Sequence, residues 1–283
     1  MKSSLKDKWV LITGASSGFG AAAARAFGAE GSRLLLGARR VERLEGVTDA
    51  TLKAGAAEAH FHFLDVSKTA SVEEFVAWAR EKMVRTPSSA VKSTREDKKS
   101  KIQNPEAAGG LHVLINNAGG ALGLEPVAEG KDEDWETMMQ TNVLGVLRMT
   151  RAALPLLPHN AGSSILNIGS YAGHAVYEGG AAYCGAKAAE LQITRTLRLE
   201  LSGTGIRVCS IDPGLAETEF SIVRFKGDTM RAKKTYEGTY PLTAEDVAEI
   251  LVWVASRPPH VNIDNMLIKC VDQAAMHKVF RRK

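Results

Sequence analysis

Tyr183 and Lys187 are the two residues whose types and spacing most clearly suggest chemistry, and they lie four positions apart in Tyr183-Cys184-Gly185-Ala186-Lys187. Residues at this spacing share one face of a helix, so both side chains can reach the same pocket. A phenol with a pKa near 10 is a poor base at neutral pH. An ammonium about 5 Å away, at an effective dielectric near 20, favours the phenolate by about 3 kcal/mol, or about two pKa units. The pair therefore predicts a tyrosine that exchanges a proton with a substrate hydroxyl.

A glycine-rich turn, Thr13-Gly14-Ala15-Ser16-Ser17-Gly18-Phe19-Gly20, joins the first expected strand to the first expected helix. Glycine permits a tight turn and a close approach of backbone N–H groups, and the helix N-terminus adds partial positive charge. The spacing is G-x3-G-x-G rather than the commoner G-x-G-x-x-G. Its position between strand and helix predicts a dinucleotide site, whose candidate residues are Gly14, Ser16, Ser17, Gly18, Phe19 and Gly20.

The end of the second expected strand bears on the choice between NAD and NADP. NAD-binding folds usually offer an acid there to the ribose 2′-hydroxyl. Here the chain reads Gly37-Ala38-Arg39-Arg40, and a guanidinium can fork onto a 2′-phosphate. Arg39 and Arg40 therefore predict NADP, and the alternative is that they only begin a solvent-facing helix.

Strands and helices must alternate to position these residues. We expect strands at 9–13, 33–37, 60–64, 111–115, 164–168, 206–211 and 266–271, and helices at 21–30, from 41, 71–85, 135–157, 182–201 and 246–256. This alternation predicts right-handed βαβ crossovers. We therefore expect an α/β fold: a single doubly wound Rossmann domain over residues 1–283, with a parallel sheet of about seven strands and helices on both faces.

One stretch, residues 86–110, does not follow this pattern. It lacks apolar periodicity, contains Pro87, Pro105 and a charge run, and is too long for an ordinary helix–strand connection. We expect a disordered insertion within the domain, and a docking or regulatory loop is the alternative.

Composition excludes several classes of function. The net charge of +4 comes from two runs, 92–101 and 281–283, which carry +3 each and leave −2 on the rest, so we expect no nucleic-acid partner. Both runs are typical of solvated, mobile peptide. No apolar run approaches the about 20 residues that cross a bilayer, and the N-terminus has no secretory core, so we expect a cytoplasmic protein without a membrane partner.

The three cysteines, Cys184, Cys209 and Cys270, are widely spaced. They offer neither a zinc spacing nor a disulfide framework, and free cysteine is usually buried. We expect three core or near-core thiols and no metal site.

Taken together and in this order, the motifs resemble the short-chain dehydrogenase/reductase family. The resemblance covers nearly the whole chain except 86–110, and it rests on the glycine-rich turn, Asp65-Val66, Asn116-Asn117-Ala118-Gly119, Asn142, Ser170, the Tyr183–Lys187 pair, and Pro213-Gly214 with Thr218. It implies that Tyr183 is the acid/base and that Ser170 donates a hydrogen bond to the substrate oxygen. It also implies that Lys187 holds the nicotinamide ribose and that Asn142 positions a water for proton relay.

The resemblance further implies a lining for the cofactor. Asp65 would contact the adenine amino group and Val66 its ring, although Asp65 also suits a plain strand-end turn. The floor would be formed by Asn117, Ala118 and Gly119, and the nicotinamide would be bordered by Pro213, Gly214 and Thr218. His174 and Tyr177 lie near Ser170 in sequence and are candidates for the substrate pocket.

Several stretches resemble one branch of the family, the NADP-dependent 3-hydroxy acid (serine-type) dehydrogenases. They include Gly18-Phe19-Gly20, 134–138, 149–152, 167–170 and 218–228, whereas the insertion and part of 177–183 depart from that branch. The resemblance implies a small 3-hydroxy acid, such as serine or 3-hydroxypropionate, or its 3-oxo counterpart as substrate. The loop 217–228 is where a substrate lid would lie, and Arg224 or Lys226 would supply a cation for the carboxylate, or else be part of a solvated loop.

Two other functions stay open. One is the same Ser-Tyr-Lys chemistry on an uncharged aldehyde, diketone or ketone. The other is a non-catalytic NADP-binding protein, against which Asn142, Ser170, Tyr183 and Lys187 all argue. The family resemblance also implies a homotetramer, in which the helices around 135–157 and 182–201 form a shared bundle.

Overall fold

The computed structural model describes residues 5–85 and 110–283. Its strands are β1 (Trp9–Thr13), β2 (Arg33–Ala38), β3 (Glu58–Phe63), β4 (Leu111–Asn116), β5 (Ser164–Ile168), β6 (Arg207–Pro213), β7 (Asn265–Ile268), β8 (Gln273–Ala275) and β9 (Lys278–Val279). Its α-helices are α1 (Gly18–Ala29), α2 (Val41–Ala54), α3 (Thr69–Arg85), α4 (Asp132–Met139), α5 (Gly145–Ala153), α6 (Ala181–Glu200), α7 (Phe220–Arg224), α8 (Thr229–Tyr236) and α9 (Ala244–Ala255). The expected insertion at 86–110 lies outside the described residues except for Gly110.

Seven of the strands form one parallel sheet in the order β3-β2-β1-β4-β5-β6-β7, which confirms the expected doubly wound fold. The chain moves outward from β1 in one direction and from β4 in the other, so the strand order reverses between these two strands. In open α/β sheets, ligands bind beyond the carboxyl ends of the strands at such a reversal. The glycine-rich turn follows β1, and Asn116-Asn117 follow at the end of β4, so both segments lie at that place.

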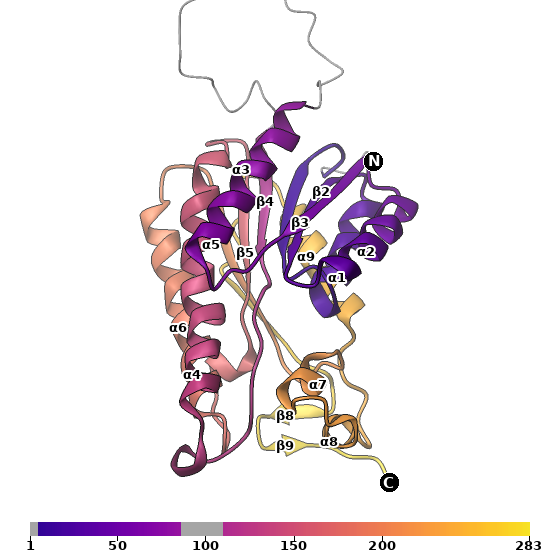
Figure 1. The fold of residues 1–283 in the computed structure, drawn as a ribbon, viewed down its shortest axis with the longest axis vertical. Coiled ribbons are helices and arrows are strands. Elements are labelled where there is room, and N and C mark those ends of the chain that lie inside the picture. The colour runs from indigo at the N-terminus through magenta and orange to yellow at the C-terminus, as the bar shows by residue number, and fades with distance from the viewer. Residues whose placement is uncertain (1–4, 86–109) are drawn as a thin grey trace, which may run out of the picture.

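Helices cover both faces of the sheet (Figure 1). In β1, Val10 and Ile12 pack with α1 and α9 in one core, whereas Trp9 and Leu11 pack with α3 and α5 in the other. This alternation follows from the two-residue period of a strand, and burial of both faces explains why the sequence of β1 is apolar throughout.

Helix α9 begins with a side-chain cap. The Thr243 hydroxyl accepts from the Asp246 backbone N–H at 3.1 Å, and the Asp246 carboxylate accepts from the Thr243 N–H at 2.7 Å, which forms a capping box.

None of the helices within the described residues is long and apolar enough to cross a membrane.

Two expected elements differ in the structure, and two further elements were not expected. The helix expected at 135–157 is interrupted by a π-helical segment at Gln140–Leu144 and ends in a 3-10 turn at Leu154–Leu156. The last strand of the sheet ends at Ile268 rather than 271. The loop 217–228 contains the short helix α7, and β8 pairs with β9 in a hairpin that the sequence did not predict.

The C-terminal run at 281–283 is not simply solvated peptide. Arg282 donates to both carboxylate oxygens of Asp272, and Arg281 donates to the backbone carbonyls of Thr235 and Glu237. These contacts hold the end of the chain against α8 and the residue before β8, at the end of the molecule that carries α7 and α8 (Figure 1).

Candidate active site

The glycine-rich turn has the backbone geometry that only glycine adopts easily. Gly14 and Gly18 have φ values of +67° and +52°, in the left-handed region. A Cβ placed on Gly20 would lie 2.5 Å from the Gly14 carbonyl oxygen, so α1 begins directly against the turn. The turn therefore leaves backbone close to the cleft at the positive end of a helix, which fits a pyrophosphate.

Asn117 holds this turn in place from the end of β4. Its side-chain amide donates to the carbonyl oxygens of Thr13 at 2.8 Å and Gly14 at 3.2 Å. The Thr13 hydroxyl in turn accepts from the backbone N–H groups of Asn117 and Ala118, each at 2.9 Å. Asn117 thus lines the cleft, as expected, and also braces the loop across the strand-order reversal.

Arg40 points back onto the glycine-rich turn. Its guanidinium donates to the hydroxyls of Ser16 at 3.3 Å and Ser17 at 2.6 Å, and to the carboxylate of Glu219 at 3.0 Å. Glu219 also accepts from Arg43 at 2.7 Å. Partial burial opposes its ionisation, but these two guanidinium groups hold the pKa of Glu219 below its ordinary value. Two guanidinium groups, two hydroxyls and the Glu219 carboxylate therefore meet where a 2′-phosphate is expected, and Arg39 lines the same cleft.

Asp65 acts as a turn former at the end of β3. Its carboxylate accepts from the backbone N–H of Ser67 at 2.9 Å and from the Ser67 hydroxyl at 2.7 Å. Asp65 and Val66 nevertheless line the cleft. The two interpretations of Asp65 are compatible, because a carboxylate held by its own turn presents a fixed acceptor to a ligand.

Tyr183 and Lys187 lie on the buried face of α6, as their spacing predicts, with 8% and 6% of their surfaces exposed. The ammonium of Lys187 donates to the Ile168 carbonyl oxygen at 2.7 Å and to the Glu190 carboxylate at 2.6 Å. Burial opposes the charge of Lys187, but the neighbouring Glu190 and Tyr183 together raise its pKa above the ordinary value. Lys187 is therefore held as a cation at the cleft.

Asn142 is placed by the π-helical segment that interrupts the expected long helix. Its side chain accepts from the Gly120 N–H at 3.0 Å and donates to the carbonyl oxygens of Gly120 at 2.9 Å and Met138 at 2.8 Å. A π-bulge shifts the following residues around the helix axis and is frequent at functional sites. Asn142 is 1% exposed and does not line the open cleft itself.

Ser170 follows β5 and caps the 3-10 turn Tyr171–Gly173, where its hydroxyl oxygen accepts from the Ala172 N–H at 3.1 Å. That bond leaves the hydroxyl hydrogen free to donate to a substrate oxygen.

One cleft of about 510 Å³ brings most of the predicted residues together. Those that line it are Gly14, Ser16, Ser17, Gly18, Phe19, Arg39, Arg40, Asp65, Val66, Asn117, Ala118, Gly119, Tyr183, Lys187 and Thr218. Gly20, Asn142, Ser170, Pro213 and Gly214 are not among the lining residues. Gly214 instead approaches the C-terminal hairpin, since the next residue, Leu215, donates its N–H to the Gln273 side chain at 2.7 Å.

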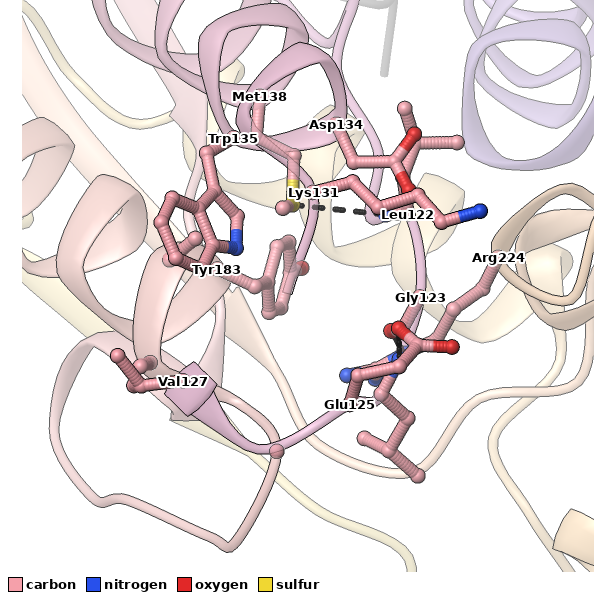
Figure 2. A pocket seen from close by; sticks show the side chains of 14 residues that line it. Leu122, Gly123, Glu125, Val127, Lys131, Asp134, Trp135, Met138, Tyr183 and Arg224 are labelled. Atoms are coloured by element: carbon pink, nitrogen blue, oxygen red, sulfur yellow. Dashed lines mark hydrogen bonds between the residues drawn. The ribbon is translucent and has the colours of Figure 1, made fainter. Parts of the chain in front are cut away.

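A smaller recess opens on another side of Tyr183 (Figure 2). Figure 2 shows Trp135, Met138 and Tyr183 along one wall and Glu125 and Arg224 at the other. The Arg224 guanidinium lies 5.7 Å from the centre of the Tyr183 ring and donates to the Tyr177 hydroxyl at 2.8 Å and the Gly123 carbonyl at 3.0 Å. The recess therefore places a cation beside the proposed acid/base.

Lys226, the other cation expected in the lid, does not share this position. Its ammonium is half exposed and pairs with the Asp134 carboxylate at 2.7 Å. Tyr177 accepts a hydrogen bond from Arg224, and burial raises the pKa of Tyr177 to about 12 although Arg224 opposes this. Tyr177 therefore stays protonated and presents its oxygen to the guanidinium.

Sequence reasoning missed Glu190 and Glu219. Glu190 lies three residues after Lys187, so the helical period offered a signal for it. Glu219 is 179 residues from Arg40 along the chain, and no local pattern reveals that contact. Phe220 is a third omission: its ring lies 5.6 Å from that of Tyr183 and closes the cleft from α7.

Comparison with known proteins places these features in one family. The model for short chain dehydrogenase matches residues 8–87 and 90–228. An NADP-dependent 3-hydroxy acid dehydrogenase of Salmonella typhi (YdfG) is 42% identical over 266 residues, covering 94% of this chain and 96% of that protein.

Two further relatives widen the picture. Sulfoacetaldehyde reductase 2 of Chromohalobacter salexigens is 40% identical over 94% of this chain and 95% of its own length. The closed form of a serine dehydrogenase complexed with NADP⁺ superimposes with a TM-score of 0.80 at 39% identity, covering 97% of this chain and all of that one.

Proposed function

Because this chain belongs to the short-chain dehydrogenase family, we propose that it is an NADP-dependent dehydrogenase of small 3-hydroxy acids, such as serine or 3-hydroxypropionate. In the reverse direction it would reduce the matching 3-oxo acid or semialdehyde. The substrate class rests on the position of Arg224, whose guanidinium lies 5.7 Å from the Tyr183 ring in a recess that Glu125 and Trp135 also line.

The residues present fit NADP. The glycine-rich turn offers backbone to the pyrophosphate, and Arg39 and Arg40 offer guanidinium groups to a 2′-phosphate at the end of β2. Lys187 has one donor left after its bonds to Ile168 and Glu190, which suits a ribose hydroxyl. The bound nicotinamide accepts or donates the hydride.

Tyr183 is proposed to take the proton of the substrate hydroxyl during oxidation and to return it during reduction. The ammonium of Lys187 on the same helix face would stabilise the negative charge that forms on the phenol oxygen in this step. Ser170 would donate to the substrate oxygen and stabilise the negative charge that develops on it. Asn142 is proposed to hold the water that passes the proton from Lys187 toward solvent.

Arg224 is proposed to bind the substrate carboxylate. Its Nε and one Nη are held by Gly123 and Tyr177, so the fork is fixed while another N–H remains for an acid. Glu125 lies in the same recess, and its carboxylate would accept a hydrogen bond from the ammonium group of serine. A sulfonate has the same charge as a carboxylate, which agrees with the sulfoacetaldehyde reductase among the relatives.

An uncharged ketone or aldehyde is the second candidate substrate. Trp135, Met138 and Val127 line the recess and favour apolar groups. This candidate predicts that turnover does not depend on a carboxylate.

We also propose that the chain assembles as a homotetramer. Met139, Leu144 and Leu147, on the π-helical segment and its flanking helices, and Leu199 on α6 are exposed apolar side chains. Such side chains favour burial against another copy. Light scattering on the purified protein would give four times the chain mass, and a monomer would reject this assembly.

A cofactor and substrate panel tests the proposed function. Purified protein is assayed by absorbance of reduced nicotinamide with NADP⁺ or NAD⁺ and with serine, 3-hydroxypropionate, a hydroxysulfonate and uncharged secondary alcohols. We expect NADP⁺ and an acid to give the highest kcat/KM. Equal turnover of acids and neutral alcohols would reject the 3-hydroxy acid assignment.

A further inference from the structure

The buried face of α6 carries an ionisable group that the roles above leave unused. Glu190 lies three residues beyond Lys187 and is 1% exposed. Its carboxylate accepts from the Lys187 ammonium at 2.6 Å, and its backbone carbonyl accepts from the Thr194 hydroxyl at 2.9 Å. Burying a carboxylate is costly unless a cation pairs with it, and the Lys187 ammonium offsets this cost for Glu190.

The charges around Glu190 come from three elements. On its own helix are Lys187 and Tyr183. From β6, the buried Asp212 acts electrostatically on both Lys187 and Glu190. Asp212 is itself bonded to His174, after the turn that Ser170 caps, with 2.5 Å between the His174 Nε2 and the carboxylate. The Lys187 ammonium therefore lies among two carboxylates and the phenol of Tyr183.

Lys187 and Glu190 form a coupled pair, since their charged atoms lie 2.6 Å apart. Burial raises the pKa of Glu190 to about 7, although Lys187 opposes this. Ionisable groups this close titrate together, so an observed pKa describes the coupled groups rather than one residue.

We propose that Glu190 is a positioning residue of the reaction: it fixes the Lys187 ammonium beside Tyr183 and, by offsetting part of its positive charge, sets the pH range in which Tyr183 gives up its proton. The proposal rests on the proposed function, since it assumes that Tyr183 is the acid/base. The Lys187 charge alone would make the phenol more acidic than the Lys187–Glu190 pair does.

The sign of the effect follows from the charge that is removed. Glu190 and Tyr183 are seven residues apart, about 10.5 Å along a helix. At this separation one negative charge changes an ionisation by about 0.6 to 1.2 pH units at an effective dielectric of 40 to 20. Removing that charge makes the first proton of the Tyr183–Lys187 pair easier to lose, whichever residue gives it up.

The test is the pH profile of kcat/KM for NADP⁺-dependent oxidation of a 3-hydroxy acid. In Glu190→Gln, which keeps an oxygen acceptor but no charge, we expect the rising limb to move about one pH unit toward acid. In Glu190→Asp, which keeps the charge on a shorter arm, we expect the limb at the wild-type position with a lower limiting rate. Glu200→Gln, the same change at the exposed end of α6, is the matched control and should not move the profile.

A Glu190→Gln profile that coincides with wild type, or moves toward alkali, would overturn the proposal. Wild-type protein without oxidoreductase activity would instead refute the proposed function, so the two failures are distinguishable.

Infrared titration of the wild-type holoenzyme gives a second readout if the glutamine variant folds poorly. We expect the carbonyl band of a protonated carboxyl group to disappear near neutral pH and to be displaced in Glu190→Asp. A spectrum without such a titrating band would also overturn the proposal.

Discussion

Replacing Arg224 by glutamine should separate acid substrates from neutral ones. The guanidinium lies 5.7 Å from the Tyr183 ring and lines the recess proposed to bind the substrate. A hydrogen bond to a charged group contributes about 2 kcal/mol, which corresponds to about a 30-fold change in kcat/KM. We therefore expect kcat/KM for 3-hydroxypropionate to fall about 30-fold in Arg224→Gln, mainly through KM.

Controls distinguish recognition from damage to the lid. Arg224 also holds Tyr177 and Gly123, so a purely structural role would lower turnover of every substrate. An uncharged secondary alcohol should lose little, and Lys226→Gln, a matched loss of charge two residues away, should leave acid turnover near wild type. The reasoning would be refuted by equal losses for acid and alcohol, or by a Lys226→Gln effect as large as that of Arg224→Gln.

Three further changes test other parts of the molecule. Arg40→Ala should lower the NADP⁺ preference over NAD⁺ at least tenfold, because a charge-assisted contact to the 2′-phosphate is lost, and unchanged cofactor selectivity in steady-state kinetics would contradict this. Gly20→Ala should abolish NADPH binding measured by fluorescence titration, since its Cβ would lie 2.5 Å from the Gly14 oxygen, and normal affinity would mean that the turn does not form the cofactor site. Thr243→Ala should lower the free energy of unfolding by about 1 kcal/mol in urea denaturation by removing a helix cap, with kcat/KM unaffected, and an unchanged midpoint would show that the capping box contributes nothing.

The sequence predicted the elements whose signals are local. Three of these signals depend only on residues close in the sequence. They are the apolar run Trp9–Thr13, the glycines of the turn after it, and the four-residue spacing of Tyr183 and Lys187. Because parallel strands alternate with helices, the sheet and the place of the cleft followed from the same pattern.

The features that could not be predicted depend on contacts between distant segments. The stretch Gln140–Leu144 contains no glycine or proline that would signal an interruption, and its π-helical form accompanies the bonds of Asn142 to Gly120, outside the helix. The lid helix α7 and the C-terminal hairpin are short and lack a regular apolar period. Arg282, which was predicted to be part of a solvated tail, donates a hydrogen bond to the Asp272 carboxylate.

Tyr183→Phe provides the most direct test of the central claim, that a phenol beside Lys187 moves the substrate proton. The measurement is the rate of NADPH formation from NADP⁺ and a 3-hydroxy acid at saturating cofactor, with cofactor affinity measured in parallel. The account predicts that kcat/KM falls by about 10²- to 10⁴-fold, the usual contribution of general acid–base catalysis, while NADP⁺ still binds. A phenylalanine variant that turns over at the wild-type rate would contradict it.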